Sequence, residues 1–69
     1  MSRSQRQLDE LRALCERGSL SRAVDLAFEH FADFGRSDDV LDFLAAAIER
    51  TPVPEVVHRR FLDLQSARR

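Results

Sequence analysis

Glu55 and His58, near the end of the chain, have the spacing that a helical metal site would use. Helical di-iron bundles take a Glu-x-x-His pair from each of two helices, together with two further inward-pointing glutamates. This chain contains the pair once, so a complete site would require a second copy of the protein. Glu55 is also explained as an acidic residue in the first turn of a helix, and His58 as a surface histidine. We therefore predict no metal site and no other cofactor.

Cys15 and His30 are the other side chains whose chemistry could support catalysis. A cysteine nucleophile needs a base nearby and a positive environment. Cys15 instead follows Leu14 on an apolar stripe, where a free cysteine commonly serves as a small core residue. His30 lies beside an apolar helical face, which favours half-buried packing. With no Ser/His/Asp order and no glycine-rich phosphate loop, the sequence predicts neither an enzyme nor a small-molecule substrate.

The length and composition are those of one small globular domain. The chain has 69 residues, of which 43% are hydrophobic and 33% charged, a balance typical of folded rather than disordered proteins. Its single cysteine cannot form an internal disulfide, so packed helices or self-association must supply the stability. All 11 basic residues are arginines, which together with abundant Ala, Leu and Asp suggests a GC-rich, bacterial genome. The absence of a long apolar run or a signal-peptide core predicts a cytoplasmic protein without a membrane segment.

The segment that organises the chain is residues 20–34. Its apolar side chains recur at steps of four and three, which places them on one side of a helix; they are Leu20, Val24, Ala27, Phe31 and Phe34. A helix of this length is marginally stable alone in water. We therefore expect the rest of the chain to cover its apolar face.

Serines and glycines mark the helix boundaries. Ser4 is expected to cap the first helix and Ser37 the third, while Gly18 and Gly35 supply the left-handed residue that ends the first and second helices. The predicted helices are residues 4–17, 20–34, 38–50 and 54–66. Because the loops are short, successive helices must run antiparallel. The predicted fold is one all-α domain, residues 1–69: a small antiparallel bundle of three to four short helices.

The helices carry more apolar residues than one small core needs. Several of them lie at the margins of the apolar stripes, where they could contact another molecule. We predict that the chain forms a homodimer or binds a protein partner through them. The residues predicted for this interface are Leu26, Phe28, Phe31, Leu41, Phe43 and Leu62.

Three acidic residues, Asp25, Glu29 and Asp33, follow one another at steps of four on the central helix. Like charges at this spacing repel each other by a few tenths of a kcal/mol when exposed. We interpret them as an acidic ridge that binds a basic partner or the basic ends of a second copy. On this interpretation, removing their charges should stabilise the free protein and weaken its association.

The two ends of the chain are basic, and this supports an alternative hypothesis. Residues 1–24 carry five arginines against three acids, and residues 56–69 carry four against one. Arg59 and Arg60 could then contact phosphates of nucleic acid. A recognition helix should be basic on its exposed side, however, and the second and third helices present Asp and Glu there.

The run from Leu14 through Gly18 to Ala23 resembles the turn of a tetratricopeptide-type hairpin, in which glycine ends one helix and a small alanine follows early in the next. Ala27 stands where that repeat has a large aromatic residue, and no second copy follows at the expected period. We draw no function from this resemblance, but it shares with the residue patterns the idea of a helical hairpin that binds peptides or helices.

The sequence as a whole favours a non-enzymatic interaction module, such as an adaptor, a small regulator or an assembly subunit. The alternative is a small DNA-associated transcriptional regulator.

Overall fold

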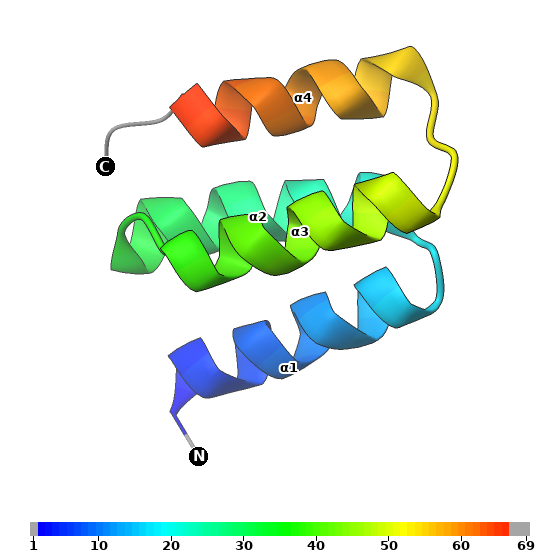
Figure 1. Ribbon diagram of the computed structural model, residues 1–69. Helices are drawn as coiled ribbons and strands as arrows, with labels where there is room; N and C mark the ends of the chain where they lie inside the picture. Colours follow the sequence, from blue (N-terminus) through cyan, green and yellow to red (C-terminus); the bar gives the residue numbers. More distant parts are fainter. Residues whose placement is uncertain (1, 67–69) are drawn as a thin grey trace.

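Four α-helices make up the regular structure of residues 2–66, the part of the chain that the computed structural model describes, and no strand occurs within that part. The helices are α1 (Arg3–Glu16), α2 (Leu20–Phe34), α3 (Asp38–Arg50) and α4 (Glu55–Ser66). Each helix runs opposite to the one before it, so α2 and α4 point in the same direction, and α4 makes its main contacts with α2 rather than with α3 (Figure 1). The predicted all-helical fold is confirmed, with four helices in one compact unit.

The second helix lies at the centre of the packing, because α2 contacts each of the other three helices. It also supplies six buried residues, more than any other helix, namely Leu20, Ala23, Val24, Ala27, His30 and Phe31. Phe34 was expected on this buried face but is 46% exposed. It is the last residue of α2, where the neighbouring helices no longer enclose its ring.

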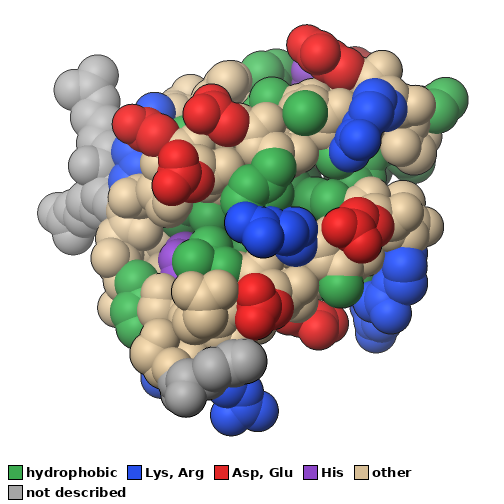
Figure 2. All heavy atoms as spheres, turned by 60° about the horizontal axis from the view of Figure 1, so that its bottom comes forward, with side chains coloured by type: hydrophobic (Ala, Val, Ile, Leu, Met, Phe, Trp, Pro, Cys, Tyr) green, Lys and Arg blue, Asp and Glu red, His purple; other side chains and the backbone are tan. Residues whose placement is uncertain are grey.

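One core joins the four helices, and each helix contributes a fully enclosed leucine to it. These are Leu11 from α1, Leu20 from α2, Leu44 from α3 and Leu64 from α4. Outside the core the charged groups are mixed. Figure 2, with the α1 side turned forward, shows hydrophobic side chains along the middle of this face and both basic and acidic side chains among them.

The first helix begins at a different serine from the one expected, and it ends at the expected glycine. Ser2 rather than Ser4 is the N-cap, and its side chain accepts a hydrogen bond from the backbone N–H of Gln5. Sequence patterns allow either serine, because both precede a helix-forming run. At the other end Gly18 has φ +77°, and its N–H donates to Cys15 O while the N–H of Ser19 donates to Leu14 O. These two bonds form the Schellman motif that a left-handed glycine permits.

The second glycine acts differently from Gly18, contrary to the expectation. Gly35 has φ +91° and ψ 175°, so the chain leaves α2 in an extended direction rather than through a Schellman motif. Ser37 then caps α3 as predicted, since its Oγ accepts a hydrogen bond from the N–H of Val40. Ser19 occupies the N-cap position of α2, but its side chain makes no capping hydrogen bond.

The Schellman motif gives a test of the turn between α1 and α2. An added Cβ at Gly18 would meet only Thr51 Cγ2, at an ordinary 3.8 Å, so the cost of Gly18→Ala comes from the left-handed backbone and not from a clash. We expect Gly18→Ala to lower the free energy of unfolding by about 1 kcal/mol in urea titrations. Gly18→Asn should cost less, because asparagine tolerates this conformation. Equal losses for both variants would contradict this explanation.

Candidate interaction surface

Two of the six predicted interface residues belong to the core of the protein itself. Phe31 and Leu41 are 5% and 6% exposed, so in the isolated chain both side chains pack in the core and offer little surface to another molecule. The reason is that α2 packs against three helices at once, so even the margins of its apolar face and of the α3 face are covered. Leu26 remains half-buried, and Leu62 on α4 is 49% exposed.

The other two interface residues, Phe28 and Phe43, are half-buried under arginines. The guanidinium carbon of Arg60 lies 5.2 Å from the centroid of the Phe28 ring, and that of Arg12 lies 5.8 Å from the Phe43 ring. At these distances the cation is attracted to the face of the ring. The protein's own arginines therefore cover the two rings that were expected to contact a partner.

The acidic ridge of Asp25, Glu29 and Asp33 is also largely occupied within the chain. Asp25 forms an ion pair with Arg60 of α4, and Asp33 forms one with Arg3 of α1 at 2.7 Å. The expected mutual repulsion is therefore offset for two of the three carboxylates. Within residues 2–66 only Glu29 among the three has no ion-pair partner.

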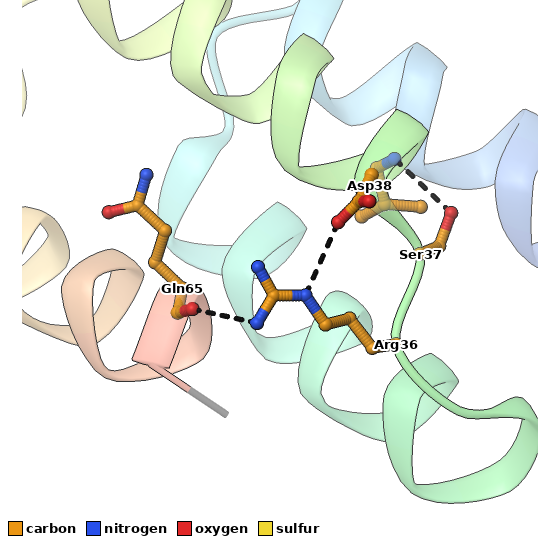
Figure 3. Close-up of polar contacts among 5 residues, drawn as sticks. Arg36, Ser37, Asp38 and Gln65 are labelled. Atoms are coloured by element: carbon orange, nitrogen blue, oxygen red, sulfur yellow. Dashed lines mark hydrogen bonds and ion pairs between the residues drawn. The ribbon is translucent and has the colours of Figure 1, made fainter. Parts of the chain in front are cut away.

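Within residues 2–66, the arginines predicted to bind phosphates contact carboxylates of the protein itself. Arg59 lies 3.6 Å from Glu55, one turn earlier on α4, and Arg60 contacts Asp25, so both predicted phosphate-binding residues have carboxylate partners. Arg36, in the loop between α2 and α3, donates to the carbonyl oxygen of Gln65 at 3.2 Å and also contacts Asp38 (Figure 3). Its charge lies at the last turn of α4, where free carbonyls favour a cation.

A groove runs between α1 and α2 on the outside of the bundle. Two adjoining hollows of about 340 and 390 Å³ share Glu10 and Leu26 among their lining residues. We call this surface the α1–α2 groove, and it is lined by Arg3, Arg6, Gln7, Glu10, Leu14, Arg22, Asp25, Leu26 and Glu29. It brings Leu26 together with two residues of the acidic ridge. The sequence did not reveal the α1 side of the groove, because that side depends on how the two helices pack.

A separate hollow, of about 440 Å³, lies at the end of the bundle where the connector 52–54 meets the start of α2. We call it the connector hollow, and it is lined by Gly18, Ser19, Leu20, Ser21, Arg22, Pro52, Val53, Pro54, Val56 and Val57. Six of these residues are apolar, and Val56 is 64% exposed. The two prolines restrict the connector, but no local pattern in the sequence indicates how it packs against α2.

The candidate catalytic and metal-binding side chains come from three helices: Cys15 from α1, His30 from α2, and Glu55 and His58 from α4. Cys15 is buried, and desolvation raises the pKa of its thiol, with a smaller opposing effect from Arg50. His30 is fully buried rather than half-buried, and its Nδ1 donates a hydrogen bond to Gln7 Oε1 at 2.8 Å. Glu55 and His58 are both exposed. Among residues 2–66 no three His, Cys, Asp or Glu side chains are grouped so that they could hold a metal ion.

Comparisons with known proteins give no relative to set beside this surface. The chain matches no protein-family model, and neither the curated proteins nor the solved structures contain a match to it. Within the described part of the chain, none of the helices has the length and apolar character needed to cross a membrane.

The ion pairs reverse one expectation and so generate a test. We expect Asp25→Asn to lower the free energy of unfolding by about 0.5 kcal/mol, because it removes a half-exposed pair with Arg60. Glu29→Gln, the matched control, should leave it nearly unchanged. Urea titrations in dilute buffer and in about 1 M salt should show that salt screens the Asp25 effect. Stabilisation by both substitutions would instead show that repulsion within the ridge dominates.

The buried thiol predicts a dependence of stability on pH. Because the pKa of Cys15 is higher in the folded state, unfolding releases its proton at alkaline pH. The contribution to the free energy of unfolding is complete below the ordinary thiol pKa of about 8.5 and is lost as the pH rises towards the folded-state pKa. Urea titrations between about pH 7 and 10 should show this loss in the wild type and not in Cys15→Ala. Parallel pH profiles would contradict it.

Proposed function

We propose that this protein is a non-enzymatic protein–protein interaction module: an adaptor, a small regulator or a subunit of a larger assembly. The observation that carries the proposal is the connector hollow, whose walls are mainly apolar and open to solvent. When a partner covers apolar surface of this kind, the surface is removed from water and the complex is stabilised.

The connector hollow has fixed walls. On one side the Schellman motif at Gly18 sets the path of the chain into α2, and on the other Pro52 and Pro54 restrict the connector. Leu20 and Val57 form an enclosed floor, while Val56 projects into solvent at the rim. Such a hollow can receive an aliphatic side chain from a longer segment, and its open rim allows that segment to continue past it.

The module is also proposed to associate with itself and to act in the cytoplasm. Apolar side chains outside the hollow, including Leu62 and the half-buried Leu26, support association with a second copy. The lone Cys15, buried and reduced, suits a reducing compartment.

The connector hollow can be tested by placing a charge on its rim. Val56→Asp should keep the fold, because the side chain is exposed and an acid suits the first turn of a helix. We expect it to weaken partner binding at least about tenfold, since the carboxylate would be buried against apolar walls. The matched control is Ala46→Asp, which places the same charge at an exposed position of α3 outside the hollow.

The measurement is quantitative co-purification from the native host with wild type, Val56→Asp and Ala46→Asp as baits. Thermal unfolding by circular dichroism shows that each bait is folded. A partner retained by Ala46→Asp and lost by Val56→Asp supports the proposal. Partners retained equally by all three baits, or no specific partner of the wild type, would overturn it.

A further inference from the structure

Arg22, Leu26 and Glu29 form a stripe on the outer side of α2. Their spacing of four and then three residues places them on one face of the helix. Arg22 and Glu29 are exposed and Leu26, between them, is half-buried. We call this set the outer stripe of α2, and all three residues line the same hollow of the α1–α2 groove.

The two charges of the outer stripe are not paired with other residues of the described part of the chain. Asp25 and Asp33, on the same side of the helix, are paired with Arg60 and Arg3. Within residues 2–66, neither Arg22 nor Glu29 has an ion-pair partner. An unpaired positive charge and an unpaired negative charge therefore lie on opposite sides of Leu26 along the helix.

This arrangement is complementary to itself. If a second α2 packs antiparallel against the first about a twofold axis near Leu26, Arg22 of each copy lies opposite Glu29 of the other. Arg22 and Glu29 are seven residues apart, which is about 10 Å along a helix, so both pairs form at once around the two leucines. A twofold contact of this kind closes on itself and produces a dimer.

We propose that the outer stripe of α2 is the contact surface between two copies of this chain, packed antiparallel through Leu26 and two Arg22–Glu29 ion pairs. The inference rests on the self-association included in the proposed function and names its surface. The α1–α2 groove provides space beside each Leu26 for the partner's leucine, next to Leu14 and Glu10. A second copy fits better than nucleic acid, because a surface with one charge of each sign gives no net attraction for phosphates.

The ion pairs can be tested by exchanging charges. Arg22→Glu and Glu29→Arg each place like charges opposite one another twice in the dimer, and each should raise its dissociation constant about tenfold or more. An equimolar mixture of the two variants restores both pairs in a heterodimer, as does the double variant Arg22→Glu/Glu29→Arg in a homodimer. Sedimentation equilibrium over about 10 μM to 1 mM protein measures the association, with circular dichroism as a check on folding.

A cross-linking experiment tests the position of the axis. Leu26→Cys should form an intermolecular disulfide under mild oxidation, because the two residues lie next to the twofold axis. Ala46→Cys, on the exposed side of α3, and the wild type with its buried Cys15 are the controls and should remain uncross-linked. Restored association in the mixture together with cross-linking at residue 26 supports the proposal.

Other outcomes separate this proposal from the proposed function. If the wild type dimerises but the charge exchanges change nothing, the outer stripe is wrong as the contact surface while self-association stands. If the wild type remains monomeric up to about 1 mM, both the dimer and the self-association are overturned. Binding of a different protein through the connector hollow is measured independently with Val56→Asp.

Discussion

The structure depends on the enclosure of α2 by the other three helices. Each helix is too short to be stable alone, so its stability comes from the apolar face that it buries. Because α2 contacts α1, α3 and α4, its burial requires all three of them to be in place. The core also needs all four helices, because each of them contributes one enclosed leucine. With no disulfide and no grouping of metal ligands in the described residues, packing around α2 is what makes the fold cooperative.

Arginines at the periphery complete that packing. Arg60 contacts both Asp25 and the ring of Phe28, and Arg3 contacts both Asp33 and the ring of Phe34. A planar guanidinium can lie on a ring and pair with a carboxylate at once, which an ammonium group does less well. Each exposed pair contributes little alone. Together they set the positions of α1 and α4 against α2, so the exclusive use of arginine has a structural consequence here.

More of the fold than of the surface could be predicted from the sequence. The apolar period of residues 20–34 indicated the central helix, and Gly18 and Ser37 indicated helix ends, because these signals are local. Period alone identifies an apolar face without showing how many neighbours cover it, which is why Phe31 and Leu41 were predicted to contact another molecule although both are buried in the core. Likewise, like charges on one helix suggested repulsion, whereas Asp25 and Asp33 are paired with arginines distant in sequence. The α1–α2 groove and the connector hollow depend on the packing of separate segments, so no local pattern could define them.

Arg22 connects the two proposed contact surfaces. It lines both the connector hollow and the α1–α2 groove, and it is the one charged residue among those that line the connector hollow. In the proposed dimer the same guanidinium pairs with Glu29 of the other copy. A partner whose aliphatic side chain enters the hollow beside a carboxylate would compete for that charge. Binding of such a partner and dimer formation would then oppose each other, and linkage requires that the opposition be equal in both directions. A partner without a carboxylate would leave Arg22 in the dimer contact, so the charge of the incoming segment would decide whether the module binds as a dimer or as a monomer.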